Sequence, residues 1–152
     1  MLKPGDYAND FELKDEQGDS TTLQELLAEG ELILYFYPAD FTPGCTTEAC
    51  QIRDIHEEIL DVGIKVIGIS PQGEKSHQRF INRHDLPFTL LCDPRKKVIR
   101  AFGVDGPLGF GVRRATFLIG QDMRIQERVL ADVMIGSHVS FIKKIVQGRS
   151  SS

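Results

Sequence analysis

The sequence lacks a long apolar run, a basic block and a targeting segment. Its longest apolar stretch, LILYFY at residues 32–37, is far too short to cross a bilayer. Asp and Glu outnumber Lys and Arg by 22 to 18, and no cationic stripe stands out, so we expect neither nucleic acid nor a membrane as a partner. Residues 1–20 have neither the apolar core of a signal peptide nor the Arg-rich pattern of a transit peptide. These absences predict a cytoplasmic protein.

Cysteine is also scarce, and the small number of cysteines excludes some structural roles for them. The chain has three, Cys45, Cys50 and Cys92, an odd number and too few for a disulfide framework. Cytoplasmic cysteines more often bind metals or carry out redox chemistry than form stable disulfides. A zinc site needs four ligands, usually in two close pairs, whereas here no second pair exists and the four histidines are scattered singly. We therefore expect no metal and no cofactor, which leaves packing or redox chemistry for the thiols.

The patterns that are present predict one α/β domain. Continuous apolar segments at 31–38 and 64–70 are typical of central strands covered on both faces. Apolar residues at helical spacing predict helices at 45–62, at 74–85 and from about 137 to 146. Shorter predicted elements are a hairpin around Gln17-Gly18-Asp19, helices at 22–27 and within 95–104, and strands at 88–93, 115–120 and 125–131.

This order of elements predicts a thioredoxin-like fold. Strands alternating with helices, followed by a hairpin and a last helix, give a central mixed sheet flanked by helices, here with an N-terminal β-hairpin. We expect residues 1–147 to form the single domain. The small polar residues at 148–152 are expected to form a flexible tail.

The position of Cys45 favours chemistry over packing. It follows Pro43-Gly44 and opens the helix predicted at 45–62, so its sulfur would face unpaired N–H groups and the positive end of the helix dipole. Such a placement favours the reactive thiolate form of a cysteine. Cys92 instead ends a core strand with no basic residue before Arg95, and a structural role is the simpler interpretation.

The spacing of Cys45 and Cys50 indicates movement. Five residues along one intact helix place the two Cα atoms roughly 8 to 9 Å apart, whereas a disulfide needs them within about 7 Å. The two thiols can therefore bond only after the first turns of the helix unwind. The pair suggests a reaction that includes local unfolding.

Peroxide reduction fits a helix-start thiolate with a second thiol nearby. A thiolate that meets a peroxide becomes a sulfenic acid, and a neighbouring thiol then condenses with it to a disulfide. The reaction also needs a hydroxyl donor to position the peroxide oxygens and a cation to stabilise negative charge as the O–O bond breaks. Thr42 is the candidate hydroxyl, and Pro38 would stiffen the same turn. Arg113 and Arg114, which precede the strand predicted at 115–120, are the candidate cations.

The segment YPADFTPGCTTEAC at residues 37–50 resembles the active-site segment of the peroxiredoxins, Pro-x3-Thr-x2-Cys. It is most similar to that of the Q-type peroxiredoxins, also called bacterioferritin comigratory proteins. The later segments SHQRF, LPFTLLCDPRKKVIRAFGV and RATFLIG follow in the order of that family. One departure is Pro71-Gln72-Gly73, where many relatives carry an acidic residue, and we expect it to alter a surface used by the reductant.

The resemblance implies a role for each site residue. Cys45 would be the peroxidatic cysteine and Cys50 the resolving cysteine. Arg114 matches the catalytic arginine of the family better than Arg113 does. The remaining implied roles are a peroxide pocket shaped by Pro38 and Thr42, and a supporting polar role for Glu48.

The resemblance also implies an activity. The chain would be a thiol-dependent peroxidase that reduces hydrogen peroxide and organic hydroperoxides and is recycled by thioredoxin or a similar dithiol donor. Because the resolving cysteine lies in the same chain, a monomer is expected, with a weak dimer as the other state. Two other interpretations remain: a peroxide-responsive sensor or holdase that uses the same cysteine pair, and an inert thioredoxin-like binding module.

Overall fold

The computed structural model describes residues 1–132 and 134–150, whose strands form one seven-stranded sheet in the order β2-β1-β5-β4-β3-β6-β7. The strands are β1 (Glu12–Asp15), β2 (Ser20–Thr22), β3 (Leu32–Phe36), β4 (Lys65–Ser70), β5 (Thr89–Cys92), β6 (Ala115–Ile119) and β7 (Ile125–Leu130). The three neighbours β3, β4 and β5 run parallel, and the other pairs are antiparallel. The mixed sheet and the N-terminal hairpin β1–β2 are thus as the sequence predicts.

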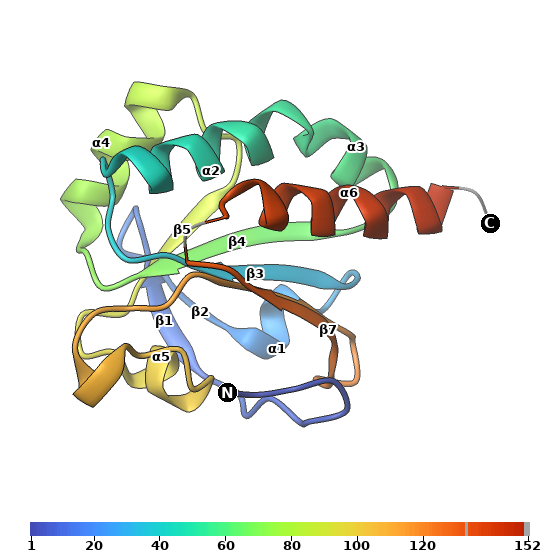
Figure 1. The fold of residues 1–152 in the computed structure, drawn as a ribbon, viewed down its shortest axis with the longest axis horizontal. Helices are drawn as coiled ribbons and strands as arrows, with labels where there is room; N and C mark the ends of the chain where they lie inside the picture. The colour runs from blue at the N-terminus through green and yellow to red at the C-terminus, as the bar shows by residue number, and fades with distance from the viewer. Residues whose placement is uncertain (133, 151–152) are drawn as a thin grey trace.

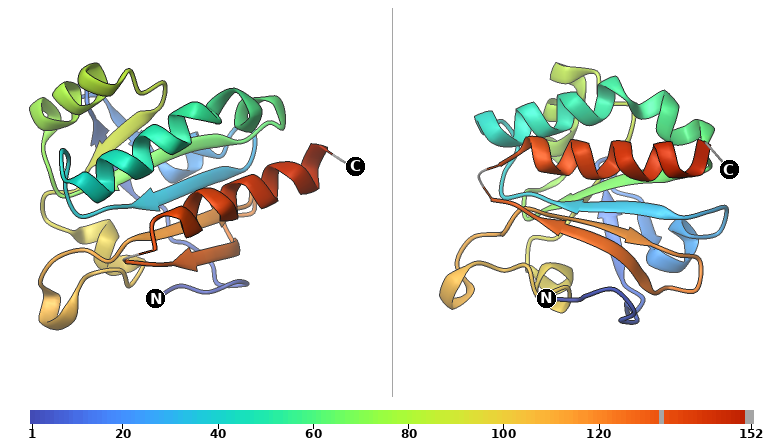
Figure 2. Two further views of the ribbon diagram at one scale, coloured as in Figure 1. Left: turned by 45° about the horizontal axis from the view of Figure 1, so that its top comes forward. Right: turned by 45° about the vertical axis from the view of Figure 1, so that its right-hand side comes forward.

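Helices cover both faces of this sheet (Figure 1). One face carries α2 (Pro43–Asp54), α3 (His56–Asp61), α4 (Glu74–His84) and α6 (Gly136–Ser150). The opposite face carries α1 (Leu23–Leu26) and α5 (Lys97–Ala101), with a 3₁₀ turn, η1 (Pro107–Gly109), after α5. Two turned views show the same layers, with α2 and α6 side by side above β3 (Figure 2).

The central strand β3 is buried along its whole length because it feeds two cores. Its alternate residues Ile33 and Tyr35 pack under α2 and α6, whereas Leu34 and Phe36 pack toward α1 and α5. This alternation follows from the two-residue period of a strand. It explains why LILYFY contains no polar residue.

Two predicted helix boundaries are wrong. The helix predicted at 45–62 is two helices, α2 and α3, because the backbone leaves helical geometry at Ile55 (φ −111°, ψ 10°). The last helix was expected to end near residue 146, but α6 continues to Ser150. Arg149 forms an ion pair with Glu31 at 3.0 Å, and this tertiary contact helps to hold the polar end of the helix in place. Residues 148–150, predicted as part of a flexible tail, are therefore helical; residues 151–152 lie outside the described part of the chain.

Among the helices of the described residues, none is both long enough and apolar enough to cross a membrane.

Candidate active site

Cys45 lies in the first turn of α2, at the end of the loop that leaves β3. The helix starts here because Thr42 is extended (φ −73°, ψ 148°) and Pro43 occupies its first turn, where a proline needs no hydrogen-bond donor. The Cys45 side chain is only 1% exposed. Its sulfur is therefore buried at the positive end of a helix, an environment that stabilises negative charge.

Arg114 brings a guanidinium group to this sulfur. Antiparallel pairing of β6 with β3 sets Ala115 opposite Phe36, so Arg114 lies beside the point where the chain leaves β3 for the loop. Its Nη1 and Nη2 atoms are each 3.4 Å from Cys45 Sγ. Gly44 leaves room for this approach, since a Cβ there would lie 3.1 Å from Arg114 Nη2.

The neighbouring Arg113 faces away from the site. It forms an exposed ion pair with Asp132 at 3.1 Å. The same carboxylate accepts a hydrogen bond from the Arg114 backbone N–H at 2.9 Å, which fixes the strand entry. The geometry thus agrees with the sequence-based preference for Arg114 over Arg113.

Glu48 shares the guanidinium with Cys45. It lies three residues further along α2, is fully buried, and its Oε1 accepts a hydrogen bond from Arg114 Nη1 at 2.8 Å. Burial raises the pKa of Glu48 to about 7, although the charge of Arg114 acts in the opposite direction. The supporting residue proposed from the sequence is therefore an ionisable group in direct contact with the catalytic candidates.

The loop that carries Pro38 and Thr42 is held by Gln72, for which the sequence indicated a different role. The Asp40 backbone N–H donates to Gln72 Oε1 at 3.0 Å, and Gln72 Nε2 donates to the Pro38 carbonyl at 3.2 Å. Gln72 thus faces the active-site loop and not only the surface that we expected the reductant to use. The Thr42 hydroxyl donates to the Ala39 carbonyl at 3.1 Å.

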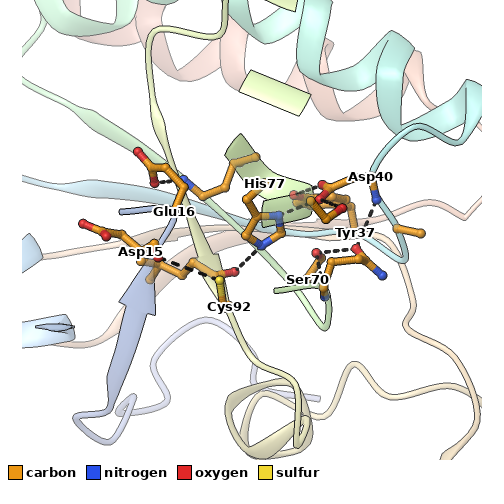
Figure 3. A network of polar contacts seen from close by, with 12 residues as sticks. Asp15, Glu16, Tyr37, Asp40, Ser70, His77 and Cys92 are labelled. Atoms are coloured by element: carbon orange, nitrogen blue, oxygen red, sulfur yellow. Dashed lines mark hydrogen bonds and ion pairs between the residues drawn. The ribbon is translucent and has the colours of Figure 1, made fainter. Parts of the chain in front are cut away.

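Beneath this loop lies a buried ion pair between Asp40 and His77 (Figure 3). His77 Nδ1 is 2.7 Å from Asp40 Oδ2, and His77 Nε2 is 3.0 Å from the Leu91 carbonyl. Both partners are acceptors, so the ring donates from both nitrogens and is an imidazolium. Burial opposes this charge, but the hydrogen bond that the ring donates to Asp40 and the charge of Asp40 outweigh burial and raise the pKa of His77 to about 9.

The other carboxylate contacts come from Tyr37 and Ser76. The Tyr37 hydroxyl donates to Asp40 Oδ1 at 2.6 Å and the Ser76 hydroxyl donates to Oδ2 at 2.7 Å. Nothing in the local sequence pattern marks these residues, since Asp40 and His77 are 37 positions apart. A buried network of this kind is visible only once α4 is packed against the loop.

The other two cysteines differ in their surroundings. Cys50 is half-buried on α2, in the same intact helix as Cys45, as predicted. Cys92 is buried at the end of β5, where its Sγ lies 3.9 Å from the Asp15 carbonyl across the strand pair (Figure 3). The sequence showed no basic neighbour for Cys92, but the fold brings His77 near it, and Cys92 contributes to the raised pKa of His77. All three cysteines are free thiols.

The structure therefore brings Cys45, Glu48 and Arg114 into one contact group, with Pro38 and Thr42 in the loop beside it. Within the described chain, no group of three or more His, Cys, Asp or Glu side chains is arranged to hold a metal ion. The chemistry available to the site is that of a buried cysteine sulfur next to a fixed cation.

Comparisons with known proteins agree with this arrangement. The model of the AhpC/TSA family matches residues 4–128. The chain is 41% identical to peroxiredoxin Bcp of Bacillus subtilis over 130 residues, which cover 82% of each chain. The chain belongs to the AhpC/TSA family of peroxiredoxins.

Solved structures place this peroxiredoxin among the Q-type proteins. Peroxidoxin BcpB from Mycobacterium tuberculosis superposes with a TM-score of 0.90 at 34% identity, covering 97% of this chain and 98% of the other. A structure of the Xanthomonas campestris bacterioferritin comigratory protein, described as giving insight into alkyl peroxide reduction, superposes with a TM-score of 0.83 at 28% identity, covering 91% and 90%. The predicted family and thioredoxin-like fold are thereby confirmed, and this peroxiredoxin is a peroxidase.

Proposed function

We propose that this peroxiredoxin reduces hydrogen peroxide and organic hydroperoxides through a peroxidatic Cys45, which Cys50 resolves as an intramolecular disulfide. The observation that carries the proposal is the contact of both Arg114 Nη atoms with Cys45 Sγ, at 3.4 Å each. A cation fixed at this place stabilises the thiolate before the reaction. It also stabilises the charge that develops on the peroxide oxygens as their bond breaks.

In the first step the Cys45 thiolate attacks the terminal oxygen of the peroxide. An S–O bond forms, the O–O bond breaks, and the sulfur gives up two electrons to yield a sulfenic acid and an alkoxide, which is protonated to the alcohol. The Thr42 hydroxyl already donates its hydrogen to the Ala39 carbonyl. Toward a bound peroxide it therefore acts as an acceptor, which orients the O–H of the substrate.

In the second step the Cys50 sulfur attacks the sulfenic sulfur and expels water. Both residues lie in α2, so the first turns of this helix must unwind before the two sulfurs meet. The resulting disulfide is reduced by thioredoxin or a similar dithiol donor. We place this cycle in the cytoplasm, where such donors keep cysteines reduced.

The direct test is multiple-turnover peroxide consumption coupled to thioredoxin, thioredoxin reductase and NADPH. Cys45→Ser should abolish turnover, while Cys92→Ser, the matched control at a buried thiol outside the site, should retain it. Turnover that persists in Cys45→Ser would overturn the assignment. Oxidation of Cys45 without turnover by any dithiol donor would instead support a peroxide-responsive sensor or holdase.

A further inference from the structure

Glu48 is a buried acid that the proposed steps do not use. One of its oxygens, Oε1, shares Arg114 Nη1 with Cys45 Sγ. The other, Oε2, is buried and has no hydrogen-bond partner within the described chain. Two acids on one helix face thus depend on a single guanidinium group.

His138 on α6 lies beside the unpartnered oxygen, with its Nδ1 3.7 Å from Glu48 Oε2. Its Nε2 is 2.8 Å from the Ala131 carbonyl, an acceptor, so Nε2 carries the hydrogen. Its Nδ1 lies 2.9 Å from the Thr116 hydroxyl, which donates to it when the ring is neutral. The single lone pair of Nδ1 is then used by Thr116, and the ring offers no hydrogen to Glu48 Oε2. An ionised carboxylate oxygen that is buried without a donor is unfavourable, and a proton on Glu48 lowers this cost.

The surrounding charges place that proton on Glu48. The titratable and charged groups around Glu48 are Cys45 on its own helix, Arg114 before β6, Tyr35 on β3 and His138 on α6. Burial lowers the pKa of His138 and the charge of Arg114 lowers it further, and together they outweigh the hydrogen bond that the ring donates to the Ala131 carbonyl and the charge of Asp132. Burial raises the pKa of Glu48 and also that of Tyr35, which stays a neutral phenol.

We propose that Glu48 holds a proton while Cys45 is a thiolate and gives it up when Cys45 is oxidised, because the two acids compete for Arg114. The inference rests on the proposed role of Cys45. In the reduced enzyme the guanidinium balances the thiolate and Glu48 is neutral. Once Cys45 is an uncharged sulfenic acid, the same guanidinium is free to balance an ionised Glu48.

With this proton, the first step is balanced in atoms and in charge. The Cys45 thiolate, protonated Glu48 and a hydroperoxide give Cys45 sulfenic acid, ionised Glu48 and an alcohol. The sulfur loses two electrons to the peroxide oxygens, and the alkoxide gains the proton that Glu48 loses. No net proton is then taken from the solvent during this step.

The ionised Glu48 also changes what holds Cys45 in place. Arg114 gains a full ion pair with Glu48 at the moment that the thiolate charge disappears. The contact between Arg114 and Cys45 is weakened only after oxidation, which is when α2 must release Cys45 toward Cys50. Glu48 thus links the redox state of Cys45 to the release of the helix.

The test measures protons taken up in a single turnover. A Cys50→Ser background stops the reaction at the sulfenic acid, and a pH-indicator dye follows the solvent at roughly pH 6, about one unit below the pKa of Glu48. In the Cys50→Ser protein with Glu48 present, close to zero protons should be taken up from the solvent per peroxide reduced. With Glu48→Gln the uptake should rise to about one proton per peroxide, because a deprotonated thiolate reacts and no stored proton is available. Glu57→Gln, the same change at an exposed site on α3, should behave like the background.

A second measurement does not require Glu48 to be replaced. The infrared carbonyl band of a protonated carboxylic acid should be present in the reduced Cys50→Ser protein and disappear after one equivalent of peroxide. Labelling of glutamate with ¹³C should shift that band. A band that persists after oxidation, or uptake of one proton with Glu48 intact, would overturn the inference. Mass spectrometry separates the two proposals: no oxygen added to Cys45 would instead mean that the proposed function is wrong.

Discussion

At the scale of single residues, the site depends on which of two adjacent arginines turns inward. Successive residues of an extended chain point to opposite sides. Arg114 is 6% exposed and contacts Cys45, whereas Arg113 pairs with Asp132 at the surface. The two side chains have the same chemistry, so only their orientation separates the proposed catalytic role of Arg114 from the surface position of Arg113.

Arg114→Lys should react far more slowly with peroxide than the parent protein. Lysine keeps the charge but loses the planar fork by which both Nη atoms reach Cys45 Sγ. Removing one such transition-state contact typically lowers the rate by about 10² to 10³. Stopped-flow peroxide reduction measures this, with Arg113→Lys as the adjacent control, which should be nearly normal. The opposite ranking would show that the wrong arginine was assigned.

His77 should make stability depend on pH in the mildly alkaline range. Its pKa is about 9 in the folded protein and about 6.5 in an unfolded chain, so folding favours the protonated ring. The contribution is complete below about pH 6.5 and is lost as pH rises toward 9, with a size of roughly 3 kcal/mol. Denaturant unfolding at several pH values measures it. In His77→Gln the free energy of unfolding should change less with pH between about 6.5 and 9.

The matched control for this prediction is His84→Gln, on the same helix but partly exposed. It should keep the slope of the parent protein. Glu48 also titrates, but with a pKa of about 7 it changes the free energy of unfolding at lower pH than His77 does. All three proteins contain Glu48, so its contribution cancels in the comparison of the parent protein with His77→Gln and His84→Gln. An unchanged slope in His77→Gln would show that the ring is not the titrating group.

At the scale of elements, α2 carries Cys45, Glu48 and Cys50 on one short helix. The helix ends at Asp54, and the chain bends at Ile55 before α3 begins. Beyond its end the chain is anchored by Ile55 and Ile59, which are buried in the core, while its first residues continue from the loop held by Gln72. The start of α2 can therefore unwind between two fixed ends.

Oxidation should melt the first turns of α2. A disulfide between Cys45 and Cys50 cannot form within the intact helix, because roughly 8 to 9 Å separates the Cα atoms. Backbone amides across residues 45–52 should exchange faster with solvent in the disulfide form than in the reduced form, as measured by hydrogen exchange with mass spectrometry. Amides of α6, which packs beside α2, serve as the internal control. Equal exchange in both redox states, with the disulfide confirmed, would show that no unwinding occurs.

At the scale of the whole molecule, the two faces of the sheet differ in their cores. The core under α1 and α5 is mainly apolar, with Phe36, Phe102 and Phe117 in mutual ring contact, and the buried Asp93 accepts hydrogen bonds from the start of α5. The core under α2, α4 and α6 holds the ionisable groups, including Glu48, His77 and His138. The candidate active-site residues thus lie on the side of the sheet that α2 covers.

The oxidised protein should remain a monomer. Cys50 lies in the same helix as Cys45, so resolution needs no second chain. After one equivalent of peroxide, a non-reducing gel should show a single monomeric band, and peptide mapping should find the Cys45–Cys50 disulfide. Light scattering checks the mass in both redox states. A peroxide-dependent dimer band, or a Cys45–Cys92 bond, would contradict this prediction.

The sequence by itself determined most of the elements, the family and the helix start at which Cys45 lies. These are local properties: LILYFY has the length and the continuous apolar pattern of a strand covered on both faces, and Pro43-Gly44 before Cys45 marks a helix start. The sequence did not predict the break between α2 and α3 at Ile55 or the end of α6 at Ser150. A local pattern does not show which tertiary contacts stabilise a helix end.

Only the tertiary structure decided how the charges are shared. Glu48, Arg114 and His138 come from three separate elements, as do Asp40, Gln72 and His77. Whether such a group is charged depends on its burial and on the atoms facing it, and both arise only when distant segments pack together. For that reason Glu48 looked from the sequence like a supporting polar residue, and the folded chain makes it a competitor of Cys45 for one cation.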